Sequence, residues 1–258
     1  MSQLQRYSIA YLTIARKEIL RFSRIWIQTI VPPVIMVALY FIIFGNLIGA
    51  RIGRMDGMPY IDFIMPGLIM MAIITNSYSN VVSSFFSAKF SRHIEEMLVS
   101  PIPNLVILLG FLTGGIARGL SVGLAVTLVS LFFTSFQVHH PLMVIGVAFL
   151  TSLLFSLAGL INGVFAKSFD DVSIVPTFVL TPLIYLGGIF YSIQLLPPFW
   201  QQVSLGNPIL YMINSFRFGF LGVSDIAIGS ALLVISAFII VLFALALTLL
   251  NRGIGIRQ

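Results

Sequence analysis

One short run of the sequence has the residue spacing of a motif that carries the nucleophilic serine in hydrolases. Gly119-Leu-Ser121-Val-Gly123 matches G-x-S-x-G, the turn that presents the nucleophile in many serine hydrolases. That chemistry needs a strand-to-helix turn and a histidine base, whereas this run lies inside a long apolar stretch, and no such stretch contains a histidine. We therefore do not expect a hydrolase.

The lysines lack the context of a nucleotide-binding loop. A P-loop needs a Gly-Lys pair, so that backbone amides surround the phosphate while the lysine reaches it. The three lysines instead follow Arg16, Ala88 and Ala166. The sequence also contains no cysteine, which excludes disulfides, thiolate metal sites and cysteine nucleophiles. We expect this chain to be no enzyme and to bind no metal or cofactor.

Other titratable side chains avoid the middle of the apolar stretches. A proton-coupled carrier usually keeps a carboxylate or a histidine inside its helix bundle. Asp62 lies at the edge of a stretch, and the remaining candidates fall in the segments between stretches: Glu95, Glu96, Asp170, Asp171, His93, His139 and His140. Proton coupling is therefore disfavoured, whereas sodium coupling through backbone carbonyls stays open.

Arg118 is the one charge far from either end of its apolar stretch. At the centre of a membrane helix it would cost on the order of 3 kcal/mol on insertion scales, so it should face protein or water. Two interpretations stay open: a residue of a pathway or gate, and an arginine that snorkels along a long, tilted helix. Gly115, Gly119 and Gly123 share one helix face beside it, which predicts the close approach of another helix.

The composition requires a membrane as the main solvent. Of 258 residues, 59% are hydrophobic and only 9% are charged, and the mean hydropathy is +1.06, whereas about a quarter of a typical soluble domain is charged. The apolar stretches lack the alternation of barrel strands, so they must be helices. We predict a single all-α membrane domain, 1–258, with six transmembrane helices at 26–48, 63–86, 105–136, 142–165, 174–191 and 229–250.

The positive charges predict the orientation of this domain. An even number of spans places both termini on one side, and that side is cytoplasmic because ten of the 14 Lys and Arg residues fall on it. They are Arg6, Arg16, Lys17, Arg21, Arg24, Lys89, Arg92, Lys167, Arg252 and Arg257. The net charge of +6 is therefore a topology signal, and no nucleic-acid partner is expected.

Two flanking segments are predicted to be helical without crossing the membrane. Residues 4–24 have apolar positions at helical spacing and cations on other faces, which predicts an interfacial amphipathic helix on the inner leaflet; a frayed tail is the alternative. Residues 194–224 are interrupted by prolines and a glycine, which predicts external re-entrant helices. A seventh span over 209–223 would be too short and would contain Asn214 and Arg217.

The segment 87–100 predicts a short, charged cytoplasmic helix. Its apolar positions share one face, its charged positions lie on the others, and Pro101 and Pro103 end it. The apolar face consists of Phe90, Ile94, Met97 and Leu98, and the charged positions are Arg92, Glu95 and Glu96. Such a helix is suited to docking in a groove on a soluble partner; the alternative is a helix that lies on the membrane surface.

Three stretches together resemble the permeases of ABC-2 type transporters, and the resemblance covers nearly the whole chain. The first is Phe63-Ile-Met-Pro-Gly-Leu-Ile69, and the second is Arg92 to Pro103 with its run Glu-Glu-Met-Leu-Val-Ser-Pro-Ile-Pro. The third runs from Pro182-Leu-Ile-Tyr-Leu-Gly-Gly-Ile-Phe-Tyr191 through Leu-Pro-Pro-Phe-Trp200 to Asn207-Pro208. Each is weak alone, and their order and spacing make them specific.

The resemblance implies partners and roles. Residues 4–24 match the connecting helix of that family, and 87–100 match the coupling helix that contacts the ATPase. It implies a homodimer of permeases with two copies of a separate ATPase subunit, which binds the ATP and Mg. The implied coupling residues are Phe90, Arg92, His93, Ile94, Glu95, Glu96, Met97 and Leu98. Where many members have Glu-Arg-Glu followed by Gly-Thr, this chain has Ser-Arg-His-Ile-Glu-Glu, so the ATPase contacts can differ in detail.

The function expected from these observations is that of the membrane subunit of an ATP-driven exporter in a bacterial inner membrane. Its cargo would be a hydrophobic or amphiphilic drug, lipid or lipid-linked glycan, moving at the dimer interface beside membrane lipid. Candidate pathway residues are Asn76, Tyr78, Arg118, Thr177, Phe178 and Tyr185. Two other classes stay open: an ion-coupled secondary carrier, and a membrane assembly or scaffold protein without flux.

Overall fold

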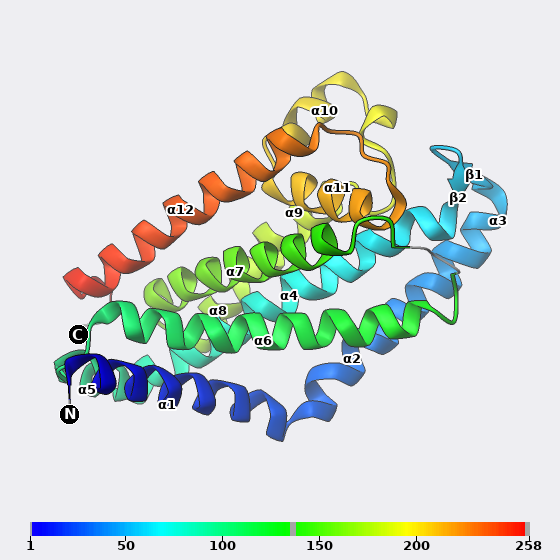
Figure 1. Ribbon diagram of the computed structural model, residues 1–258. Helices are drawn as coiled ribbons and strands as arrows, with labels where there is room; N and C mark the ends of the chain where they lie inside the picture. Colours follow the sequence, from blue (N-terminus) through cyan, green and yellow to red (C-terminus); the bar gives the residue numbers. More distant parts are fainter. Residues whose placement is uncertain (1, 135–137, 256–258) are drawn as a thin grey trace.

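The computed structural model describes residues 2–134 and 138–255, and almost all regular structure in them is helical (Figure 1). The first half comprises α1 (Gln3–Arg24), α2 (Trp26–Tyr40), the π-helical η1 (Phe41–Ile48), α3 (Gly49–Ile52), the paired strands β1 (Arg54–Met55) and β2 (Met58–Pro59), α4 (Tyr60–Phe90), α5 (His93–Val99) and α6 (Asn104–Ser130). The second half comprises α7 (Pro141–Phe165), α8 (Phe169–Val175), the π-helical η2 (Pro176–Leu180), α9 (Thr181–Tyr185), the 3-10 helix η3 (Ile193–Leu195), α10 (Pro198–Leu205), α11 (Pro208–Leu221) and α12 (Ile228–Arg252).

Five helices in the described residues are long and apolar enough to cross a membrane. They are Trp26–Ile52, Tyr60–Phe90, Asn104–Ser130, Pro141–Phe165 and Ile228–Arg252. The expected span 174–191 corresponds instead to α8, η2 and α9, which end at Tyr185. Pro176 and Pro182 have no amide hydrogen to donate within this run, which accounts for its irregular helical geometry. The six-span count therefore stays a prediction.

Several expected boundaries were wrong. The third span was predicted over 105–136, but α6 ends at Ser130, and Phe136 lies outside the described residues. The second span extends to Phe90 and so includes the start of the expected coupling helix, which is separate only from His93 onward. Arg92 lies between them in the left-handed region, with φ 59°, and this conformation ends the helical path of α4.

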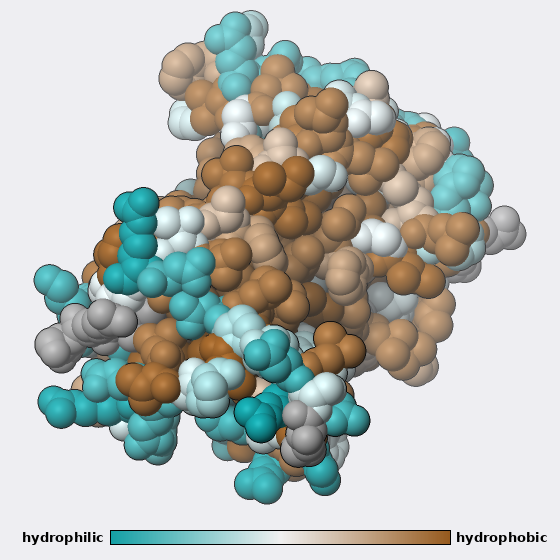
Figure 2. All heavy atoms as spheres, turned by 60° about the vertical axis from the view of Figure 1, so that its left-hand side comes forward, coloured by the Kyte–Doolittle hydropathy of each residue, from teal (hydrophilic) through white to brown (hydrophobic). Residues whose placement is uncertain are grey.

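The two ends of the described chain lie at the same end of the bundle in Figure 1, near α5, whereas β1 and β2 lie at the opposite end. Hydrophilic residues gather in the lower part and at the top of the face shown in Figure 2, and hydrophobic residues cover its middle. This distribution agrees with a bundle whose middle lies in hydrocarbon.

Helix α4 is the centre of the bundle, and α6, α7 and α11 pack around it. Glycines on α6 make this packing possible: an added Cβ would clash with Ser156 at Gly115 and with Ser77 at Gly119. At Gly159 of α7 it would lie 2.5 Å from the carbonyl oxygen of Tyr78. The close approach predicted from the glycine spacing is thus confirmed.

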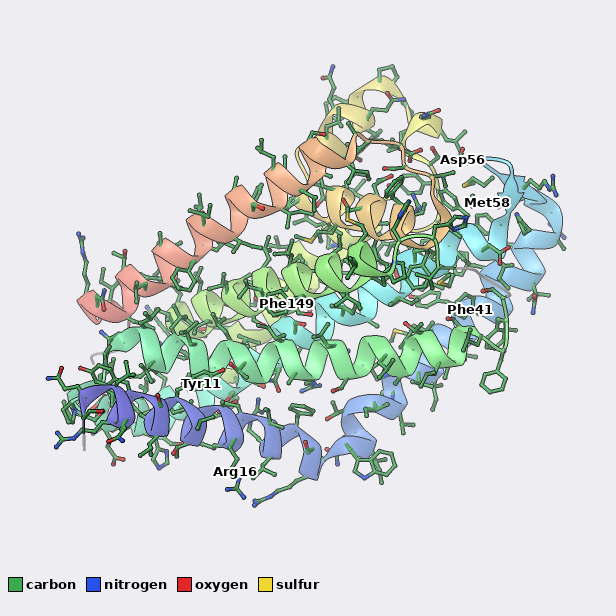
Figure 3. All side chains as sticks on the ribbon, viewed as in Figure 1. Tyr11, Arg16, Phe41, Asp56, Met58 and Phe149 are labelled. Carbon is green, nitrogen blue, oxygen red and sulfur yellow. The ribbon has the colours of Figure 1, made fainter. Side chains whose placement is uncertain are left out.

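Helix α1 packs along the first half of α6 rather than forming a frayed tail (Figure 1). Gly110 and Gly114 of α6 lie directly against Ile14 and Glu18. Figure 3 shows Tyr11 between α1 and α6, and its hydroxyl lies 2.9 Å from that of Thr113. The amphipathic helix expected over 4–24 is therefore present, with one face covered by protein.

Candidate functional site

An apolar groove of about 400 Å³ lies between α2, α4 and α9. Apolar side chains, prolines and methionines among them, form most of its wall, and a few amide and hydroxyl groups add hydrogen-bonding capacity. Its lining residues are Pro32, Pro33, Met36, Val37, Tyr40, Met71, Ala72, Thr75, Asn76, Thr181 and Tyr185. The hydroxyl groups of Tyr40 and Tyr185 lie 3.1 Å apart and join α2 to α9. Such a surface fits an apolar ligand that carries one or two polar groups.

The predicted pathway residues do not form one cluster. Asn76 and Tyr185 line the groove. Tyr78 is buried at 2% exposure on α4 and does not line it, and Thr177 and Phe178 are exposed on η2. Helical spacing explains the separation, because Tyr78 lies two residues beyond Asn76 and so projects from a different side of α4.

Arg118 reaches the groove through Asn76. Its Nη2 donates to Asn76 Oδ1 at 3.2 Å, and Asn76 Nδ2 donates to the carbonyl oxygen of Ala72 at 3.0 Å. The guanidinium is thus held against α4, inside the bundle, and does not extend toward a helix end. This geometry argues against snorkelling, and the role of Arg118 in a pathway stays a prediction.

A buried carboxylate that the sequence analysis missed lies between α1, α4 and α6. Glu18 is completely buried, and its Oε2 accepts from Ser84 Oγ at 2.6 Å and from Arg21 Nε at 3.3 Å. Arg21 Nη2 also donates to the backbone oxygen and to Oδ1 of Asn80, both at 2.8 Å. The bundle therefore contains a carboxylate although no expected span does. The spacing of Gly110 and Gly114 was the available signal, since it accommodates this face of α1.

The expected coupling segment, 87–100, exposes only part of its apolar face at the molecular surface. Ile94 is completely buried, and Met97 and Leu98 are partly buried against the bundle core, so these three side chains hold α5 in place. Phe90 is 65% exposed and precedes α5 at the end of α4. The expectation that all four apolar side chains of this segment are available for docking is therefore corrected. The polar members Arg92, His93 and Glu96 are exposed, and Glu95 is partly buried.

The loop between α7 and α8 lies against this segment. Lys89 Nζ donates to the carbonyl oxygens of Val164 at 2.6 Å and Ala166 at 2.7 Å, which satisfies acceptors at the end of α7. The amides of Lys167 and Ser168 donate to Asp171 Oδ2 at 2.8 and 3.0 Å. These hydrogen bonds, that of Lys167 foremost, hold the pKa of the Asp171 carboxyl below its usual range.

At the other end of the bundle, Arg217 anchors α11 to the segment after α9 and to α4. It is 1% exposed, donates to the carbonyl oxygen of Gly188 at 2.6 Å, and lies 3.9 Å from the centroid of the Phe63 ring. Asp225 accepts from Ser192 Oγ at 3.0 Å nearby. The sequence analysis placed Arg217 in the external segment 194–224, and its side chain is buried.

Comparisons with known proteins identify the family. The profile of the ABC-2 type transporter family matches residues 9–221. The chain is 60% identical over 252 residues to the inner membrane transport permease YadH of Escherichia coli strain K12, with 98% of each chain covered. It is 24% identical to nodulation protein J of Rhizobium meliloti strain 1021, over 94% of this chain and 93% of that protein. The chain belongs to the ABC-2 type transporter family of membrane permeases.

Proposed function

We propose that this chain forms the translocation pathway of an ATP-driven exporter in a bacterial inner membrane. The groove between α2, α4 and α9 carries this proposal, because its wall is apolar and bears only a few hydrogen-bonding groups. The cargo is a hydrophobic or amphiphilic molecule: a drug, a lipid or a lipid-linked glycan. Both termini are cytoplasmic in this proposal.

The energy comes from a separate ATPase subunit that binds ATP and Mg. The sequence has no Gly-Lys pair for a phosphate-binding loop. The exposed ring of Phe90 and the polar side chains of Arg92, His93, Glu95 and Glu96 supply the contact with that subunit. Two permease copies and two ATPase copies make up the complex, with the pathway at the permease interface.

Site-specific photo-crosslinking tests the ATPase partnership. A photoreactive phenylalanine analogue replaces Phe90. The matched control replaces Phe132, which is 87% exposed and follows the C-terminal end of α6, the end distant from α5. We expect position 90 to capture an ATP-binding subunit in native membranes and position 132 to capture none. Capture of that subunit at neither position, or at both positions equally, contradicts the proposal.

An ion-coupled carrier is the second candidate, because Glu18 provides a buried carboxylate with one oxygen, Oε1, that accepts no hydrogen bond from the described residues. Proton coupling often uses such a group. Transport by the purified permease in vesicles that contain no nucleotide, driven by a pH gradient and lost in Glu18→Gln, would establish this class. Dependence on the ATPase subunit and on ATP excludes it.

A further inference from the structure

Two loops that are distant in the sequence form one surface at the α5 end of the bundle. The rings of Phe90 and Phe169 are 65% and 59% exposed, and their centroids lie 5.2 Å apart. Phe86 lies beneath both, with its ring centroid 6.0 Å from that of Phe90 and 4.9 Å from that of Phe169. The α4–α5 turn and the α7–α8 loop are thus joined by aromatic contacts.

A polar pocket of about 200 Å³ opens beside these rings. Three cations line it, Lys89, Arg92 and Lys167, together with a single carboxylate, Glu95. In residues 2–134 and 138–255 the one ion pair is that of Arg21 with Glu18, so none of the three cations lies within 4.0 Å of a carboxylate oxygen there. The pocket carries an excess of positive charge.

The carboxylate of Asp171, in the first turn of α8, lies outside the pocket wall. It accepts hydrogen bonds from the backbone amides of Lys167 and Ser168. Lys89 is held in place by two carbonyl oxygens. A carboxylate that entered the pocket would therefore meet one cation, Lys89, already held in position, and charge-assisted hydrogen bonds to fixed donors are the stronger kind.

We propose that the α7–α8 loop, residues 166–168, together with Phe169 at the start of α8, is a second docking element for the ATPase subunit, and that the pocket between it and the α4–α5 turn receives an Asp or Glu side chain of that subunit. This inference rests on the proposed function. Exposed aromatic rings beside a pocket are typical anchors of protein interfaces. The pocket volume also suits one side chain, and because Ile94 of the expected apolar face is buried, the exposed ring of Phe169 beside Phe90 completes the anchor.

The first test extends the photo-crosslinking to Phe169. We expect positions 90 and 169 to capture the same ATP-binding subunit, and the peptide captured at 169 to contain an acidic residue. Capture at 90 without capture at 169 overturns the docking inference and leaves the proposed function standing. Absence of the subunit from both positions contradicts the proposed function as well.

The second test reverses one charge. Lys167→Glu in the intact complex should weaken ATPase binding about tenfold, because it places a carboxylate where one is to bind. Arg51→Glu is the matched control, since Arg51 is exposed at the opposite end of the bundle and should leave that affinity unchanged. Unchanged affinity in Lys167→Glu, or an equal loss in both variants, overturns the inference.

An anionic lipid headgroup is the other possible occupant. Binding of the purified permease to phosphatidylglycerol vesicles distinguishes it from the ATPase carboxylate. We expect Lys167→Glu to leave vesicle binding unchanged while it weakens ATPase binding. Loss of vesicle binding with intact ATPase affinity would identify a lipid site and overturn the inference.

Discussion

The two sides of α4 differ in how closely neighbouring helices approach it. On the side of α6 and α7, glycines let side chains and backbone meet directly, as at Gly159 against the carbonyl group of Tyr78. On the side of α2 and α9, a groove of about 400 Å³ remains. One helix therefore serves as the scaffold of the bundle on one side and as a wall of the proposed pathway on the other.

The residues at each contact explain this difference. Glycine removes the side chain that would separate two helix backbones, so the scaffold side closes. Helix α2 carries Pro32 and Pro33 within its length and continues as the π-helical η1, so its backbone hydrogen bonding is irregular beside the groove. We expect the scaffold side to tolerate few substitutions and the groove side to tolerate many.

The largest effect is expected where α11 meets α4 at Phe63. Arg217→Met removes the hydrogen bond to Gly188 and the contact with the Phe63 ring, and should lower the free energy of unfolding by on the order of 3 kcal/mol. Thermal unfolding in detergent measures it, with the exposed Arg54→Met as control. Equal midpoints for the two variants would show that Arg217 does not anchor α11.

A smaller loss is expected from one added methyl group on the scaffold side. Gly159→Ala should cost about 2 kcal/mol, because its Cβ would lie 2.5 Å from a backbone oxygen that cannot move away freely. Gly146→Ala in the same helix is the matched control, since in the described part of the chain no atom beyond its chain neighbours and the adjacent helix backbone lies within 4 Å of its added Cβ. It should stabilise by up to about 1 kcal/mol through helix propensity. A gain in both variants would contradict close packing at Gly159.

Arg118 lies at the border of the two sides, and the same substitution there should cost less. Arg118→Met removes one hydrogen bond of 3.2 Å but also removes a charge from the apolar stretch. The free energy of unfolding should therefore change by less than about 1 kcal/mol. A loss as large as that of Arg217→Met would make Arg118 a structural anchor and not a pathway residue.

The smallest effect is expected on the groove side. Tyr185→Phe removes the hydroxyl contact with Tyr40 and should cost about 0.5 kcal/mol. Tyr40→Phe breaks the same contact, so the double variant should lose no more stability than the two single losses added together. A double-mutant cycle measures this coupling. A loss of several kcal/mol would show that the groove side is as rigid as the scaffold side.

The sequence by itself determined the features that local pattern and solvent impose. A bilayer demands long apolar helices, so the stretches 26–48 and 142–165 correspond to α2 with η1 and to α7. The close packing of Gly115 and Gly119 followed from their spacing on one helix face. The short helices η3, α10 and α11 followed from the prolines and the glycine of 194–224, whereas their re-entrant role stays a prediction.

Only the tertiary structure decided which distant segments meet. An amphipathic pattern indicates a face, but it does not say what covers that face, so the burial of Glu18 and of Ile94 could not be predicted from their own helices. The groove and the cationic pocket likewise depend on how α2 approaches α9 and how Lys167 approaches Arg92. Such contacts arise from packing between elements far apart in the chain, and the periodicity of each single element is compatible with many such arrangements.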